Sequence, residues 1–160
     1  MSIKPKLKIF LADDDAVDAS LFSGALDELP SPSDFTWAED GVMLLNFLNE
    51  FFLPDIIFLD VNLPCIDGIE CLRQIRSNDE FDSIPIVMYS SYYDESNINT
   101  CYQTGANLYI VNPFTYPSIL NMLTEVISID WKNRMLRTHK NEFVRYYGED
   151  QKNLFFYKTN

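Results

Sequence analysis

The sequence has few positively charged residues, a single histidine and no long hydrophobic run. Its 160 residues include 12 Lys and Arg against 24 Asp and Glu, which gives a formal net charge of −12. Because phosphate contacts require clustered Lys and Arg, this balance opposes direct binding to nucleic acid or to an anionic membrane surface. No apolar stretch approaches the roughly 20 residues of a membrane span, and residues 1–5 show no signal peptide. We expect a cytoplasmic protein.

Cysteine is also scarce. Cys65, Cys71 and Cys101 are odd in number and lack the spacing of metal ligands. Without an export signal, free thiols are the expected state. The only histidine, His139, is remote in sequence from every acidic cluster, and we expect it on the surface without a functional role. The length and a hydrophobic content of 47% predict one globular domain with a sizeable core.

Short apolar runs alternate with helical patterns from residue 7 to about residue 128. Strands are expected at residues 7–11, 35–38, 56–60, 84–90 and 108–111, with helices between them and a last helix from residue 116 to about residue 131. The run Ile56–Asp60 is uncharged until its last residue, as a strand covered on both faces should be. The alternation predicts an α/β domain over residues 1–128, with a parallel sheet between helices.

Residues 129–160 form a C-terminal extension of different character, rich in basic and aromatic residues. The simpler interpretation is that its aromatic side chains pack back against the domain. The alternative is a docking segment for a partner. The sequence leaves both open.

Acidic and hydroxyl side chains stand where the expected strands end. Asp13 and Asp14 follow the first strand, Asp60 ends the third and Ser90 ends the fourth. The carboxyl ends of parallel strands meet at one edge of a sheet, where open α/β folds bind ligands. Carboxylates brought together there repel one another unless a hard cation joins them. The sequence therefore predicts a divalent-metal site and one reactive carboxylate at this edge.

Each of these residues also has a simpler interpretation. Asp13 and Asp14 can cap the helix that follows, although one aspartate is enough for a cap. Asp15 and Asp18 are expected to be helix-start charges rather than metal ligands. Ser90 can be a loop hydroxyl that satisfies a local hydrogen bond.

The order of the motifs resembles the receiver domain of response regulators, over residues 7 to about 128. The matching pieces are Asp13-Asp14, residues 58–64 with Asp67-Gly68, residues 87–91, Gly105-Ala106-Asn107 and residues 109–114. The resemblance implies a doubly wound, five-stranded parallel sheet in the order 2-1-3-4-5, with helices on both faces. It also implies a single-domain protein like the chemotaxis regulators.

The resemblance further implies a role in two-component signal transduction. A histidine kinase or a histidine phosphotransfer protein would donate a phosphoryl group to Asp60, and a downstream protein would read the result. Ser90 would hydrogen-bond a phosphoryl oxygen, and Tyr109 would be the switch aromatic that turns inward, although simple packing also explains a tyrosine there. The implied Mg²⁺ ligands are Asp13 (through water), Asp14, Asp60 and the backbone carbonyl of Asn62.

Asn112 departs from the family pattern, which has lysine immediately before the proline after the fifth strand. An ammonium there would bridge the phosphoryl oxygen and the nucleophile. A charge-assisted hydrogen bond contributes about 1.5–3 kcal/mol, whereas driving a complete two-state switch takes about 5.5 kcal/mol. Because the amide of Asn112 brings no charge, we expect phosphorylation to be retained and conformational coupling to be weaker.

Two other functions compete with a phosphoaccepting signalling domain. Asn112 favours a pseudo-receiver that docks partners without phosphorylation. An aspartyl-phosphate phosphatase also places a nucleophilic aspartate after a parallel strand, but it needs a second carboxylate two residues later, where this chain has Asn62. We therefore expect a response regulator that is no enzyme beyond catalysing its own phosphorylation and dephosphorylation.

Overall fold

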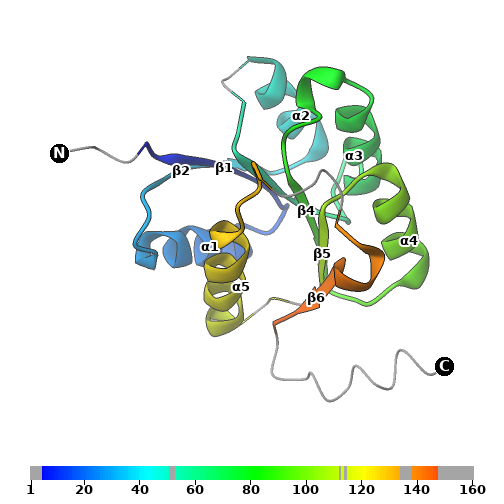
Figure 1. The fold of residues 1–160 in the computed structure, drawn as a ribbon. Helices are drawn as coiled ribbons and strands as arrows, with labels where there is room; N and C mark the ends of the chain where they lie inside the picture. The colour runs from blue at the N-terminus through cyan, green and yellow to red at the C-terminus, as the bar shows by residue number, and fades with distance from the viewer. Residues whose placement is uncertain (1–4, 51–52, 112, 114, 134–137, 148–160) are drawn as a thin grey trace.

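In the computed structural model, a parallel sheet lies between two helical layers (Figure 1). The structure describes residues 5–50, 53–111, 113, 115–133 and 138–147. The strands of the sheet follow the order β2-β1-β3-β4-β5-β6, and every pairing is parallel. The strands are β1 (Leu7–Ala12), β2 (Ser33–Ala38), β3 (Ile56–Asp60), β4 (Ile86–Ser90), β5 (Leu108–Val111) and β6 (Val144–Tyr146). The helices are α1 (Ala16–Glu28), α2 (Gly41–Glu50), α3 (Gly68–Arg76), α4 (Glu95–Thr104) and α5 (Tyr116–Ser128), with short 3₁₀ turns at Asp79–Phe81 and Lys140–Glu142.

Side-chain caps fix where most of the helices begin. The caps of α1, α3, α4 and α5 accept hydrogen bonds from backbone N–H groups of the first turn, and they are Asp15, Asp67, Asp94 and Thr115. At its other end α4 stops at Gly105, whose φ of +109° lies in the left-handed region that glycine adopts without strain. Residue types with these local preferences therefore fix the start of α3 and the end of α4.

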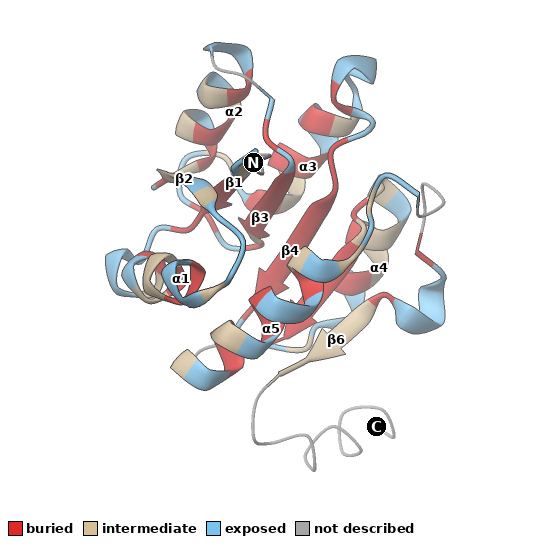
Figure 2. Ribbon diagram, turned by 60° about the vertical axis from the view of Figure 1, so that its left-hand side comes forward, coloured by how far each residue is buried: buried red, intermediate tan, exposed pale blue. Residues whose placement is uncertain are grey.

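The sheet buries a hydrophobic core on each face (Figure 2). Helices α1 and α5 cover one face, and α2, α3 and α4 cover the other. Successive residues of β3 alternate between the cores, with Phe58 on the α1/α5 side and Leu59 on the opposite side. A strand covered on both faces must be apolar at nearly every position, which explains the uninterrupted apolar runs in the sequence.

The α/β architecture and the order of the first five strands agree with the prediction, but the predicted number of strands is wrong. A sixth strand, β6, comes from the C-terminal extension and pairs with β5. The pairing begins where the N–H of Tyr109 donates to the carbonyl of Phe143 at 2.8 Å. A strand of three residues shows too little alternation to be recognised in a sequence, so only its tertiary contacts define it.

Some element boundaries differ from the prediction by two or three residues. The second strand starts at Ser33, because it pairs with β1 from Leu7 onward. The fourth strand starts at Ile86, after Pro85, whose nitrogen carries no hydrogen to donate to a neighbouring strand. The last helix ends at Ser128, since Ile129 already has extended backbone angles.

Aromatic packing anchors β6 to the domain. Phe143 is 1% exposed, and its ring centroid lies 5.1 Å from that of Tyr102 and 6.4 Å from that of Tyr109. Tyr146 stacks on Tyr93 with centroids 6.4 Å apart. The described part of the extension therefore packs back against the domain, as the simpler interpretation predicted.

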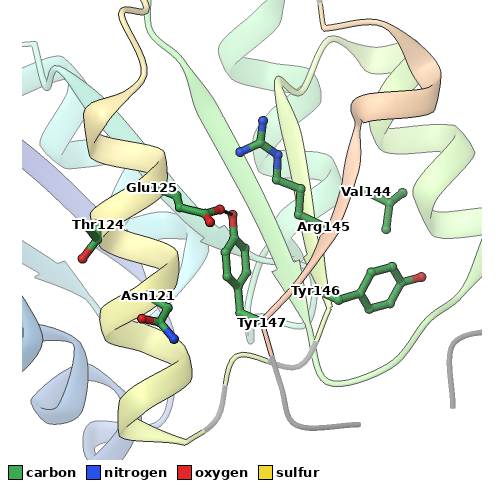
Figure 3. Close-up of a pocket in the computed structure, with 7 residues that line it drawn as sticks. All are labelled: Asn121, Thr124, Glu125, Val144, Arg145, Tyr146 and Tyr147. Carbon is green, nitrogen blue, oxygen red and sulfur yellow. Dashed lines mark hydrogen bonds between the residues drawn. The ribbon is translucent and has the colours of Figure 1, made fainter. Parts of the chain in front are cut away.

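The other side of β6 faces α5. Side chains from both elements line a surface pocket, in which the hydroxyl of Tyr147 donates to Glu125 Oε2 at 2.7 Å (Figure 3).

His139 is exposed, as expected. The three cysteines are free, with Cys65 exposed and the other two buried. Within the part of the chain that the structure describes, no helix is long and apolar enough to cross a membrane.

The packing of Phe143 predicts a large loss of stability when its ring is removed. We expect Phe143→Ala to lower the free energy of unfolding by about 3–5 kcal/mol, because it leaves a cavity beside Tyr102 and Tyr109. Urea denaturation followed by circular dichroism measures this change. The control Tyr92→Ala removes an aromatic ring that is 75% exposed, so its effect should stay within about 0.5 kcal/mol. Equal effects of the two substitutions would contradict the anchoring role.

Candidate functional site

Three carboxylates meet at the carboxyl edge of the sheet. Asp13 and Asp14 follow β1, and Asp60 is the last residue of β3. Each offers an oxygen atom, and these oxygens all lie within 4.8 Å of one another. Asp13 is buried, Asp14 is exposed and Asp60 is partly buried. The structure thus brings together the three carboxylates that the sequence singled out at strand ends.

Asp13 is held at three of its atoms. Its Oδ1 accepts the N–H of Asp15 at 2.8 Å, and its Oδ2 accepts the hydroxyl of Tyr89 at 2.6 Å. Its backbone carbonyl accepts the indole N–H of Trp37 at 2.7 Å. The cap of α1 is Asp15, which accepts the N–H groups of two first-turn residues. Asp13 and Asp14 are therefore not needed as helix caps.

The electrostatics of the cluster raise the pKa values of its carboxyl groups. Burial is the largest cause of the rise in the pKa of Asp60 to about 7, and the negative charges of Asp13, Asp14 and Asp18 add to it. Burial likewise raises the pKa of Asp13 and raises that of Asp18 to about 6. The ion pairs between described residues, Lys6 with Asp34 and Arg73 with Glu70, lie outside the cluster.

The backbone after Asp60 folds tightly over the site. The N–H of Asn62 donates to Asp60 Oδ1 at 2.9 Å and favours the ionised carboxylate. The N–H of Gly68, at the start of α3, donates to the carbonyl of Val61 at 3.0 Å. A Cβ atom on Gly68 would lie 1.9 Å from the carbonyl oxygen of Asp60. Glycine is therefore required for α3 to approach the end of β3 this closely.

Ser90 and Tyr109 lie together on the two strands beyond Asp60. Ser90 is buried at the end of β4, where its Oγ accepts the N–H of Tyr92 at 3.3 Å. Tyr109 is fully buried in β5. Burial raises its pKa to about 12, and its interaction with Ser90 opposes the rise, but the hydroxyl makes no hydrogen bond of normal geometry to a described residue. Asn112 is outside the described residues.

Two residues of the site, Tyr89 and Trp37, are not among those predicted from the sequence. Tyr89 is the residue before Ser90 in a strand that is buried throughout, and its hydroxyl also contacts the carbonyl oxygen of Ala12 at 3.2 Å. A buried tyrosine needs a partner for its hydroxyl. A tyrosine one residue before the end of a buried strand therefore indicates a hydroxyl that contacts the site, because that end of the strand lies at the acidic edge of the sheet. The indole of Trp37 reaches the site from the end of the neighbouring strand β2, and nothing in the sequence indicates that contact.

The sequence is similar to those of known proteins. The family model of the response regulator receiver domain matches residues 9–124. The chain belongs to this family. Its receiver domain is 29% identical over 121 residues to the chemotaxis protein CheY1 of Helicobacter pylori, covering 76% of this chain and 96% of that protein. It is 30% identical over 122 residues to CheY of Halobacterium salinarum, covering 76% and 97%.

Solved structures agree with the fold of this receiver domain. The phosphorylated cyanobacterial phytochrome response regulator RcpA matches with a TM-score of 0.73 and 28% identity, covering 81% of this chain and 96% of that one. The Mn²⁺-bound form of the response regulator Rcp1 matches with a TM-score of 0.71 and 25% identity, covering 84% and 100%. The protein is thus a two-component response regulator. Receiver domains are signalling modules that interact with histidine kinases or phosphotransfer proteins and with downstream targets.

The close approach at Gly68 predicts that a single methyl group disturbs the receiver domain. We expect Gly68→Ala to lower the free energy of unfolding by about 1–3 kcal/mol, because α3 must shift away from the backbone of Asp60. The matched control is Gly24→Ala, where the added Cβ meets only Tyr116 at 3.9 Å. In the interior of α1 this control should raise stability by about 0.5–1 kcal/mol. Chemical denaturation of both variants tests whether the two changes in the free energy of unfolding have opposite signs.

The raised pKa of Asp60 predicts how stability depends on pH without metal. The pKa of Asp60 is 3.8 in the unfolded chain and about 7 in the folded protein. At pH values between these two, the folded protein keeps a proton that the unfolded chain releases. The free energy of unfolding should therefore fall from pH 5 to pH 8 in the presence of EDTA. Asp13 and Asp18 contribute with the same sign.

Asp60→Asn removes the contribution of Asp60 to this dependence. We expect the variant to be more stable than the parent at pH 8 without metal, with a shallower slope between pH 5 and pH 8, both measured by thermal denaturation. A parent whose stability is constant or increases over this range would contradict the electrostatic account.

Proposed function

We propose that Asp60 accepts a phosphoryl group from a phosphohistidine of a histidine kinase or a histidine phosphotransfer protein. A carboxylate oxygen of Asp60 attacks the phosphorus atom, the new O–P bond forms, and the N–P bond breaks with its electron pair returning to the imidazole. The observation that carries this proposal is the meeting of three carboxylate oxygens within 4.8 Å of one another at the end of β3. The members of such a cluster repel one another unless a hard cation joins them.

The donor set fits a hard divalent cation, which we infer to be Mg²⁺. Carboxylate oxygens are its preferred protein ligands. Asp14 and Asp60 would bind it directly with the backbone carbonyl of Asn62, and Asp13 would bind it through water. When bound, the ion neutralises the negative charge that the cluster shares with an incoming phosphoryl group. The Mn²⁺-bound state of the similar response regulator Rcp1 supports this inference.

The chain's own residues prepare the acceptor. The N–H of Asn62 donates to one oxygen of Asp60, which limits the rotation of the carboxylate. The hydroxyl of Ser90, at the end of the adjacent strand β4, is the group that hydrogen-bonds a phosphoryl oxygen. Its movement would alter the contact with Tyr109 and so change the surface near α4 and β5. Output would then pass by protein–protein contact to a downstream target in the cytoplasm.

Phosphorylation of Asp60 predicts a specific change in mass. After incubation with Mg²⁺ and acetyl phosphate, intact mass spectrometry should show the addition of one phosphoryl group to the parent protein. The addition should be abolished by EDTA and by Asp60→Asn. The control Asp27→Asn, on the exposed surface of α1, should be modified like the parent.

The outcomes separate the competing functions. Modification that persists in Asp60→Asn would identify another acceptor, with Asp13 and Asp14 the first candidates. A parent protein that gains no mass under any of these conditions would favour a pseudo-receiver, the function that Asn112 supports in the sequence.

A further inference from the structure

Tyr89 lies on the same face of the sheet as the acidic cluster. In the register of β3 and β4 it stands opposite Asp60, and paired residues of neighbouring strands project to the same face. Its ring packs in the core beneath α1 and α5, and it is only 6% exposed. The end of this buried side chain therefore reaches the acidic cluster from inside the protein.

The hydroxyl of Tyr89 makes its short contact with the cluster itself. It donates to Asp13 Oδ2 at 2.6 Å, and the carbonyl oxygen of Ala12 lies 3.2 Å away. A hydroxyl has one proton to donate, and the shorter contact to a carboxylate is the stronger of the two. With Asp15 N–H on the other oxygen, both oxygens of Asp13 are fixed in place. The rotation of this carboxylate is therefore set by Tyr89 and by the backbone of Asp15, the cap of α1.

We propose that Tyr89 is a positioning residue of the metal site, which holds the carboxylate of Asp13 in the orientation that the metal requires. This inference rests on the Mg²⁺ site of the proposed function. Groups that hydrogen-bond metal ligands orient them and tune their affinity, and removing such a group typically costs 10–100-fold in metal affinity.

The chemistry of a phenol suits this place. The cluster contains three carboxylates, and the ion pairs between described residues lie outside it. A phenol hydroxyl withdraws negative charge from Asp13 through a hydrogen bond, yet it carries no full charge that competes with a divalent ion. Tyr89 thus lowers the repulsion in the cluster and leaves the metal site accessible.

A core role alone would not need the hydroxyl. The ring of Tyr89 packs beneath α1 and α5, where phenylalanine fills the same space. Tyr109 provides the contrast, because its hydroxyl is buried without a hydrogen bond to a described residue. The two buried tyrosines therefore differ in what their hydroxyl groups do, and only the hydroxyl of Tyr89 orients a carboxylate of the cluster.

Trp37 supplies a reporter for the test. Its indole N–H donates to the backbone carbonyl of Asp13, so a change at Asp13 alters the environment of the fluorophore. The sequence has one other tryptophan, Trp131, which the background substitution Trp131→Phe removes. In the full 160-residue chain, Mg²⁺ is titrated by Trp37 fluorescence. The same dissociation constants are obtained independently from the rise in melting temperature with Mg²⁺ concentration.

We expect Tyr89→Phe to weaken Mg²⁺ binding about tenfold, the lower end of the typical loss for such a partner. The matched control is Tyr147→Phe, which removes a hydroxyl that donates to Glu125 Oε2 at 2.7 Å, between β6 and α5 (Figure 3). This control deletes a phenol–carboxylate bond of nearly equal length and should leave the dissociation constant of Mg²⁺ unchanged. Urea denaturation in EDTA shows whether each variant is folded.

A double substitution tests the route through Asp13. In an Asp13→Ala background, adding Tyr89→Phe should cause no further loss of Mg²⁺ affinity, because the group that Tyr89 positions is already absent. A further tenfold loss there would overturn the proposal. So would Mg²⁺ affinities within twofold of the parent for Tyr89→Phe, or an equal loss in Tyr147→Phe. If the parent itself binds no Mg²⁺, the proposed function fails first and the role of Tyr89 fails with it.

Discussion

Repulsion among carboxylates at the edge of the sheet is the constraint on which the site depends. Three oxygens of like charge within 4.8 Å are stable only if the surrounding backbone holds them there. Among the residues that the structure describes, Asn62, Asp15, Tyr89 and Trp37 donate hydrogen bonds to the carboxylates or their backbone, and the ion pairs lie outside the cluster. The fold thus keeps a site that is strained without a ligand and relieved by one. This is the property that a metal-dependent acceptor needs, because binding then supplies the missing charge.

Most of the fold follows from local patterns in the sequence. Uninterrupted apolar runs such as Ile56–Leu59 indicate strands covered on both faces, and capping residues such as Asp67 mark the starts of helices. The sixth strand does not follow from such patterns. Its three residues are partly buried without alternation, and its register depends on Phe143 inserting beside Tyr102 and Tyr109. Contacts between distant parts of the chain decide that pairing, and a sequence pattern does not encode them.

In the candidate site, too, some residues are predictable from the sequence and others are not. The carboxylates and Ser90 are predictable because parallel strands all end at one edge, so the position of a residue along the chain fixes its position in space. The residues that hold the carboxylates are different. Trp37 and Tyr89 reach the site by the direction of their side chains, and Gly68 matters through the space that a missing atom leaves. Such features depend on how two elements approach each other, which only the packed structure defines.

The sixth strand also has a consequence for protein engineering. Exposed edge strands invite pairing with other chains, and natural proteins blunt them with short strands and charged residues. Here β5 is an interior strand, and the outer edge is the three-residue β6 with Arg145 at its centre. A fluorescent or enzymatic reporter fused directly after α5 would strip this cover and leave a buried, apolar strand open to aggregation. In a sensor made from this domain, the reporter should therefore be joined after residue 147, so that β6 still covers the edge of β5.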